Sequence, residues 1–271
     1  MKFSVSNIGL TAYDHADQLK QLPEMGFEGL EVGLSRVWKE GWNNPTAVQV
    51  DAYRHEVEAS GLRVVGLHSL FWQRPELSLF GTADTVAKTA DFLVGLSKLC
   101  RDLGGRTLIY GSQTARTRGN LSLKEANTQA TDFFADLCRR VEDHGTCFCF
   151  EPLETEVADY INSALESLAV VKAVNHPALQ VQIDAKALAA NGEADPATIR
   201  AVADHLVHVH VNEPGLNVLG SSGKVDHAAL GTMLRDIDYQ GFVSIEQRQF
   251  NDSDPLVDIA KSADHLKECY G

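Results

Sequence analysis

The sequence contains, at residues 147–151, the run CFCFE, in which large apolar residues alternate with small or polar ones. Side chains two apart in a β-strand lie on the same face, so this run predicts a strand with one apolar and one polar face. The same alternation occurs in VQID, VHVHVN and VSIE, at residues 181–184, 207–212 and 243–246. A parallel strand covered on both faces by helices should be apolar throughout. We therefore expect the apolar faces to lie under helices and the polar faces to line an interior.

These runs belong to a longer pattern, in which a short β-like run is followed by a helical segment, and the pattern occurs eight times. In the segment before residue 147, Ala130, Phe133, Phe134 and Leu137 fall at helical spacing. Alternating strands and helices predict parallel strands joined by helical crossovers. Eight repeats in 271 residues predict an α/β fold with a single closed (β/α)₈ TIM barrel as one domain over residues 1–271, because such barrels have about 250 residues. The expected strands are residues 2–8, 27–33, 63–70, 107–112, 147–152, 179–185, 206–212 and 241–247.

Composition narrows the possible partners and the compartment. The formal net charge of −13 disfavours binding to nucleic acid, whose phosphates it would repel. No apolar run reaches the roughly 18 residues of a membrane span, and the N-terminus lacks the apolar core of a signal peptide. The five cysteines are odd in number and form no CxxC pair, which disfavours a disulfide framework. We expect a cytoplasmic protein that contacts neither membrane nor nucleic acid.

Four polar residues fall at or near the carboxyl ends of the last four expected strands: Glu151, Asp184, His210 and Glu246. Barrel enzymes place their chemistry at that end. One such carboxylate would most simply be a solvated rim residue or half of an ion pair. Three that converge in an interior would repel one another unless they bind a cation. Oxygen ligands with one nitrogen suit one divalent metal ion such as Mn²⁺, Mg²⁺ or Co²⁺, with Zn²⁺ also compatible.

Six runs together resemble the xylose isomerase-like TIM barrel superfamily, which includes sugar phosphate isomerases and epimerases and the family 2 AP endonucleases. The runs are GFEGLEVGL (26–34), CFCFEPL (147–153), QIDAKAL (182–188), HVHVNEP (208–214), GKVDHAAL (223–230) and YQGFVSIEQ (239–247). The resemblance implies that Glu151, Asp184, His210 and Glu246 bind a catalytic divalent metal. It favours His210 over His208, which we expect one layer deeper in the core, because the family's ligand heads a His-x-x-acid motif. It also implies a homo-oligomer.

Departures from the family pattern concern the substrate layer. Where keto-sugar 3-epimerases carry a second glutamate, a histidine and an arginine, this chain has Val157, Ala187 and Leu216, although Glu156 stands one place from the first. AP endonucleases need further metal-binding histidines, and the run Tyr110-Gly111-Ser112 at the end of the fourth expected strand has none. The resemblance therefore implies a retained metal site with an altered substrate layer.

Five further residues are candidate substrate-binding groups, each with a simpler alternative. His68 is expected at the end of the third strand, where it would contact substrate hydroxyls or be a capped polar residue. Lys186 and Arg248 lie two residues past Asp184 and Glu246, and each would grip substrate oxygens or lie in solvent. Glu31 would join this layer or pair with a basic neighbour. Trp72 would stack on a sugar face or anchor a loop.

These features predict a divalent-metal-dependent isomerase or epimerase that acts on a keto-sugar or a related polyhydroxy compound. The resemblance implies that Glu151 and Glu246 move the protons, next to a carbonyl polarised by the metal. One alternative is a metal-dependent lyase, a dehydratase or 3-keto-glycoside deglycosidase that acts by β-elimination. Another is a non-catalytic sugar-binding barrel.

Overall fold

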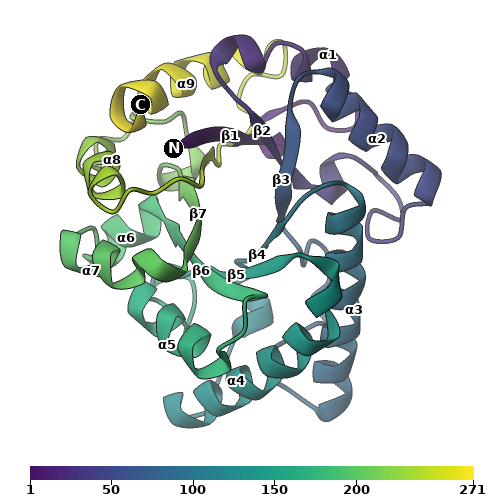
Figure 1. The fold of residues 1–271 in the computed structure, drawn as a ribbon, viewed down its shortest axis with the longest axis vertical. Helices are drawn as coiled ribbons and strands as arrows, with labels where there is room; N and C mark the ends of the chain where they lie inside the picture. Colours follow the sequence, from purple (N-terminus) through teal and green to yellow (C-terminus); the bar gives the residue numbers. More distant parts are fainter.

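The computed structural model describes all residues from 1 to 271 and contains a closed barrel of eight parallel strands. Each strand pairs with the next along the chain, and β8 pairs with β1 to close the ring. Figure 1 shows the strands around a central axis, the helices outside them, and the C-terminus at the end of α9. The expected barrel is confirmed. The strands are β1 (Lys2–Ser6), β2 (Gly29–Gly33), β3 (Arg63–His68), β4 (Thr107–Tyr110), β5 (Cys147–Phe150), β6 (Leu179–Asp184), β7 (Leu206–Val211) and β8 (Phe242–Ile245).

All eight expected strands are present, but most end one or two residues earlier than expected. The reason is visible at β5 and β8, where Glu151 and Glu246 come directly after the last paired residue. Each still donates its backbone N–H to the preceding strand, at 3.4 Å for Glu151 and 3.1 Å for Glu246, so both residues lie at the last hydrogen bond of the ladder, at the mouth of the barrel. The carboxyl ends of the strands therefore carry the polar residues, above a ladder that has register shifts in β2 and β6.

The helices begin where the sequence supplies caps. Thr46, Ser122 and Ser163 each accept a hydrogen bond from the backbone three residues on, and a Gln or Glu at that position bonds back in a capping box. No helix is long and apolar enough to cross a membrane. The helices are α1 (Ala16–Leu19), α2 (Ala47–Ala59), α3 (Ala83–Asp102), α4 (Leu123–Arg140), α5 (Ala164–Val174), α6 (Ala185–Asn191), α7 (Pro196–Val202), α8 (His227–Asp236) and α9 (Leu256–Tyr270).

The core lies between the strands and the surrounding helices. Phe148 and Phe150 of β5 are fully buried there, and the ring of Phe150 contacts Phe134 of α4, as the helical spacing of α4 predicts. The opposite faces of the strands point into the barrel, and their polar side chains are also fully buried. The structure thus has the two faces expected for these strands. The apolar face packs against the helices, and the polar face lies inside the barrel. The fully buried polar residues on these faces are Ser4, Ser6, Glu31, Gln182, His208 and Ser244.

Candidate metal centre

Four side chains converge at the carboxyl ends of β5 to β8. Glu151 and Glu246 follow β5 and β8, Asp184 ends β6, and His210 lies near the end of β7. Nδ1 of His210 is 3.1 Å from Oε1 of Glu151 and 3.8 Å from Oε2 of Glu246. The ligand atoms of Glu151, Asp184 and His210 all lie within 4.8 Å of one another. The structure therefore brings together the four residues expected to bind a metal.

Two amides hold these carboxylates in place. Nδ2 of Asn212 donates to Oδ2 of Asp184 at 2.6 Å and to Oε2 of Glu246 at 2.9 Å. Nε2 of Gln182 donates to Oε1 of Glu151 at 2.8 Å. The other oxygen of Asp184 caps α6 by accepting the backbone N–H of Ala187 at 2.8 Å. Each carboxylate thus has at least one oxygen fixed by a donor.

Electrostatics at this site favour a cation. Burial, together with the neighbouring Glu151 and Glu246, raises the pKa of Asp184 to about 7. Burial alone would lower the pKa of His210, but Glu31, Glu246 and Glu151 raise it well above its usual value. Asp184 and His210 therefore bind protons more tightly than usual, and a divalent ion can replace these protons. Three carboxylates and one imidazole nitrogen form a donor set that fits Mn²⁺, Mg²⁺, Co²⁺ or Zn²⁺.

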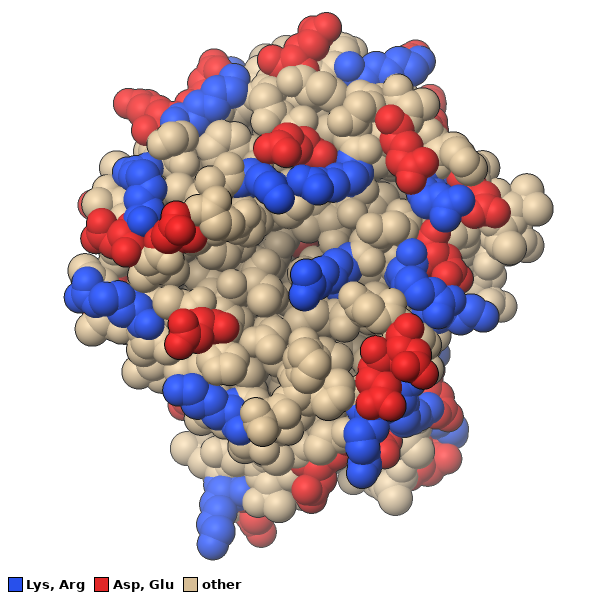
Figure 2. Space-filling view, in the orientation of Figure 1, with Lys and Arg blue, Asp and Glu red and all other residues tan.

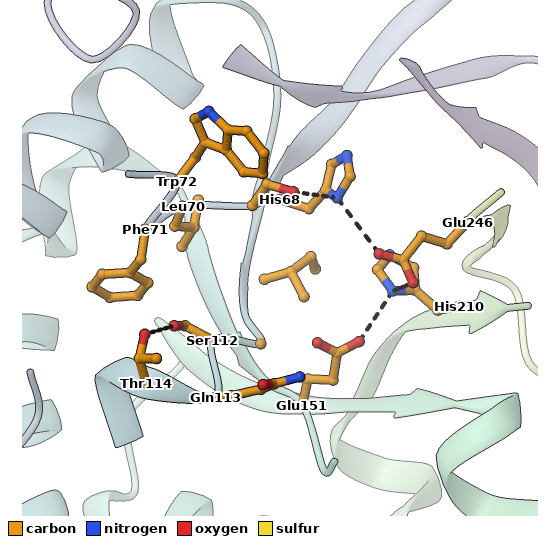
Figure 3. A pocket seen from close by; sticks show the side chains of 13 residues that line it. His68, Leu70, Phe71, Trp72, Ser112, Gln113, Thr114, Glu151, His210 and Glu246 are labelled. Atoms are coloured by element: carbon orange, nitrogen blue, oxygen red, sulfur yellow. Dashed lines mark hydrogen bonds and ion pairs between the residues drawn. The ribbon is translucent and has the colours of Figure 1, made fainter. Parts of the chain in front are cut away.

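A cavity of about 460 Å³ opens beside three of the four residues, Glu151, His210 and Glu246. Figure 3 shows these three on one side, with Leu70, Phe71 and Trp72 on another and Ser112, Gln113 and Thr114 on a third. The last two groups come from the loops after β3 and β4. The cavity therefore has one charged, one largely apolar and one uncharged polar wall.

Two of the five expected substrate-binding residues line this cavity. His68 is buried, with Nε2 2.6 Å from Oγ of Ser6 and Nδ1 3.8 Å from Oε1 of Glu246. Trp72 is 54% exposed, so its ring is available at the cavity mouth. Both positions fit contact with a bound molecule.

The other three expected substrate-binding residues lie outside the cavity. Glu31 is fully buried below the cavity. In the pairing of β2 with β3, Glu31 lies opposite Gly66, which is two residues before His68 and therefore deeper in the barrel. Lys186 belongs to α6, where the strand alternation no longer applies, and its Nζ donates to Glu154. Arg248 follows the end of β8 and is exposed.

The positions at which the chain departs from 3-epimerases also lie away from the cavity. Val157 is 40% exposed and, with Glu156, lines a separate hollow over α6. Ala187 is buried in α6, and Leu216 lies in the loop after β7 with a φ of 54°. None of the four lines the cavity beside Glu151 and Glu246. The walls that a ligand would meet are instead supplied by the loops after β3 and β4.

Sequence reasoning missed the residues of the β4 loop. Gly111 leaves room for Glu151, since a Cβ placed on Gly111 would lie 1.8 Å from Oε2 of that carboxylate. The sequence offered one indication of this contact, which is a glycine, Gly111, near the end of a predicted strand. Ser112, Gln113 and Thr114 carried no pattern from which contact with the cavity could be predicted.

Arg116 is a second missed residue. It is fully buried, and its guanidinium donates to the carbonyls of Tyr110, Ser112 at 3.0 Å and Glu151 at 2.6 Å. Burial lowers the pKa of Arg116 to about 10, although the nearby Glu151 opposes that shift, and the side chain stays charged at neutral pH. Arg116 therefore ties the β4 loop to the end of β5, next to the four converging residues.

Comparison with known proteins identifies the family that the sequence resembles. Residues 19–269 match the family described as the xylose isomerase-like TIM barrel. The D-psicose 3-epimerase of Ruminiclostridium cellulolyticum is 30% identical over 240 residues, which cover 86% of this chain and 78% of that protein. The crystal structure of D-psicose 3-epimerase with D-tagatose from Clostridium cellulolyticum H10 has a TM-score of 0.82 at 19% identity, covering 100% of this chain and 99% of that one. The apo 3-keto-D-glucoside 4-epimerase from E. coli also has a TM-score of 0.82, at 20% identity and with 99% and 100% coverage. The chain belongs to the xylose isomerase-like TIM barrel family.

Proposed function

We propose that this protein is a divalent-metal-dependent sugar isomerase or epimerase that removes a proton next to the carbonyl of a keto-sugar. The observation that carries the proposal is the position of Glu151, His210 and Glu246 on one wall of a cavity, with Asp184 beside them. These four would hold Mn²⁺, Mg²⁺, Co²⁺ or Zn²⁺. A divalent ion bound there supplies a Lewis acid that polarises a carbonyl and makes the adjacent C–H more acidic.

The two glutamates are the groups that would move protons. In Glu151, Oε1 accepts from Gln182 and contacts His210, while Oε2 has no hydrogen-bond donor. In Glu246, Oε2 accepts from Asn212, while Oε1 has no donor closer than the His68 ring at 3.8 Å. Each glutamate thus has one anchored oxygen and one available to accept a proton from substrate. Asp184 is a poor candidate because both of its oxygens accept hydrogen bonds.

The cavity suits a small polyhydroxy compound. Its volume of about 460 Å³ is typical of small-molecule sites. Ser112, Gln113 and Thr114 offer hydroxyl and amide groups to sugar hydroxyls, and Trp72 offers an exposed ring to C–H groups. The similarity to D-psicose 3-epimerase supports a keto-sugar substrate. We propose that the β3 and β4 loops contact the sugar in place of the substrate layer of 3-epimerases.

We further propose a single domain, a carbohydrate rather than a nucleic acid as partner, and a cytoplasmic location. The net charge of −13 supports the choice of partner. On the face drawn in Figure 2, blue and red side chains alternate around the rim without a continuous basic patch. All five cysteines are free and buried, as a reducing compartment allows.

The test is proton exchange in D₂O. Purified protein with Mn²⁺ is incubated with D-psicose, L-ribulose and a 3-keto-glucoside, and the products are followed by NMR. We expect an epimer or isomer that carries deuterium at the reacting carbon. Glu246→Gln and Glu151→Gln should each lower the rate at least about 100-fold, because each removes a proton acceptor. Glu268→Gln, an exposed glutamate on α9, is the matched control and should react at the wild-type rate.

Other outcomes assign the protein differently. Release of a leaving group from the 3-keto-glucoside, in place of epimerisation, would identify a lyase that acts by β-elimination. A protein that binds Mn²⁺ and sugar but exchanges no proton would be a sugar-binding barrel. Wild-type turnover by Glu246→Gln would overturn the assignment of the site.

A further inference from the structure

Glu31 is a charged residue in the barrel interior that the proposed mechanism does not use. It lies in the middle of β2, points inward and is fully buried. Its Oε2 is 2.8 Å from Nε2 of His210 and accepts a hydrogen bond from Oγ of Ser244 at 3.0 Å. Its Oε1 is 3.2 Å from Nε2 of His208. One carboxylate therefore lies between two imidazoles, with no solvent to share its charge.

The two nitrogens of His210 face different groups. Nδ1 faces Glu151 and Glu246, the proposed metal ligands, and Nε2 faces Glu31. An imidazole that binds a metal does so through an unprotonated nitrogen, so the hydrogen must reside on the other one. A carboxylate that accepts a hydrogen bond from Nε2 keeps the hydrogen there and leaves the Nδ1 lone pair free.

We propose that Glu31 is a positioning residue that fixes the tautomer and ring orientation of His210 for metal binding. The inference rests on the proposed metal site. Carboxylates bound to the far nitrogen of a histidine ligand raise the basicity of the ligand and orient its ring. Glu31 does not line the cavity, so it acts only through His210.

His208 completes this arrangement from below. Its ring is fully buried and meets the His210 ring edge to face, with centroids 5.1 Å apart and an angle of 78° between the planes. Its Nε2 lies 3.2 Å from the second oxygen of Glu31 without forming a hydrogen bond, so the hydrogen bonds of Glu31 to His210 and Ser244 are all on its other oxygen. The buried side chains of His208 and Glu31 therefore both contact His210, the proposed metal ligand, from the barrel interior. This gives His208 a role beyond that of a core histidine.

An alternative is that Glu31, His208 and His210 bind a second metal ion, since their possible ligand atoms all lie within 4.8 Å of one another. A second ion held there would require the Glu31–His210 hydrogen bond to open. The 2.8 Å contact and the absence of Glu31 and His208 from the lining of the cavity favour the hydrogen-bonded support. The number of ions bound per chain separates the two arrangements.

The experiment measures metal binding rather than turnover. Wild type, Glu31→Leu, Glu31→Gln and Glu28→Gln are stripped of metal, and their affinity for Zn²⁺ is measured by competition with a chelator. Glu28 is the matched control, because it lies on the same segment but is exposed and pairs only with Arg63 at 3.5 Å. We expect one ion per wild-type chain, about 10–100-fold weaker binding in Glu31→Leu and no change in Glu28→Gln.

Glu31→Gln and NMR keep the inference falsifiable if Glu31→Leu does not fold. Glutamine retains an acceptor but not the charge, so binding should weaken less than in Glu31→Leu but measurably. In the ¹⁵N-histidine spectrum of the Zn²⁺ form, His210 should carry its hydrogen on Nε2. Unchanged Zn²⁺ affinity in a folded Glu31 variant, a hydrogen on Nδ1, or two ions per chain would overturn the inference.

The outcomes also separate this inference from the proposed function. A wild type that binds one ion, with the expected loss in the Glu31 variants but no proton exchange on sugars, refutes the function alone. Proton exchange with unaltered metal affinity in the Glu31 variants refutes the role of Glu31 alone. A wild type that binds no ion refutes both.

Discussion

Gly111 sets how closely the Glu151 carboxylate approaches the end of β4. A Cβ at this position would lie 1.8 Å from Oε2 and 3.0 Å from Cδ of Glu151, so alanine must displace the carboxylate. We predict that Gly111→Ala weakens Mn²⁺ binding at least about tenfold, since a ligand moved by about 1 Å loses its geometry. Isothermal titration calorimetry measures this. Gly95→Ala is the control, because a Cβ on Gly95 meets nothing within 4 Å. Wild-type affinity in Gly111→Ala would show that Glu151 is not a ligand.

Metal binding should release protons in a pH-dependent way. In the metal-free protein, Asp184 has a pKa raised to about 7, and His210 has a pKa raised well above its usual value. Below pH 7 both groups carry protons that an ion must displace, whereas above pH 7 Asp184 is already ionised. We predict that metal binding releases about one proton more at pH 6 than at pH 8, because Asp184 loses its proton between these two pH values. Calorimetric titration in buffers of different ionisation enthalpy measures the number, and a constant value across this range would contradict the assignment.

The four converging residues could be predicted from sequence because two rules place them. Strand alternation puts a side chain inside the barrel, and the end of the strand puts it at the mouth. Glu31 obeys the first rule, but its height depends on the register between β2 and β3, which sequence does not reveal. Lys186 and Arg248 do not line the cavity, because the chain leaves the strand before them and alternation no longer sets the direction of their side chains.

At the scale of elements, the loop after β4 is held by one buried cation. Arg116 donates to four main-chain carbonyls: one at the end of β4, one in the loop itself, one directly after β5, and that of Ile161 at 3.5 Å. We predict that Arg116→Met lowers the free energy of unfolding by about 2–4 kcal/mol, because buried carbonyls lose charged donors. Urea unfolding measures the change. Arg139→Met, at an exposed arginine of α4, should cost under about 1 kcal/mol. Equal losses in the two variants would refute a special role for Arg116.

The elements themselves differ in how far sequence predicts them. Strands and helices follow from periodicity, and the helix starts follow from caps such as Ser122 with Glu125. The loops after β3 and β4 carry no period, and they form two of the three cavity walls. Their conformation depends on buried contacts such as the one between Arg116 and the Glu151 carbonyl, which join residues 35 apart in sequence. The four converging residues were therefore more predictable from the sequence than the cavity walls that these loops form.

For the whole molecule, closure of the barrel brings together side chains from strands that are far apart in the sequence. Because β8 pairs with β1, Glu31 of β2 can reach His210 of β7 and Ser244 of β8 across the interior. An open sheet would leave these residues far apart. Closure thus creates both the ring of donors at the mouth and the support beneath it, and it links the site to the stability of the entire chain.

Metal binding should therefore raise the thermal stability of the whole barrel. The proposed ligands come from four consecutive strands, β5 to β8, so an ion bound to the folded state joins segments that separate on unfolding. At an Mn²⁺ concentration of about 100 times Kd, we expect about 2.7 kcal/mol of added stability. For a chain of this length, that corresponds to a rise in Tm of about 5–10 °C. Calorimetric scans with Mn²⁺ and with excess chelator measure the difference. Glu142→Gln, at an exposed glutamate, should keep the full rise, whereas Glu246→Gln should lose most of it because the donor set is incomplete. An equal rise in Glu246→Gln and wild type would place the bound ion elsewhere on the molecule.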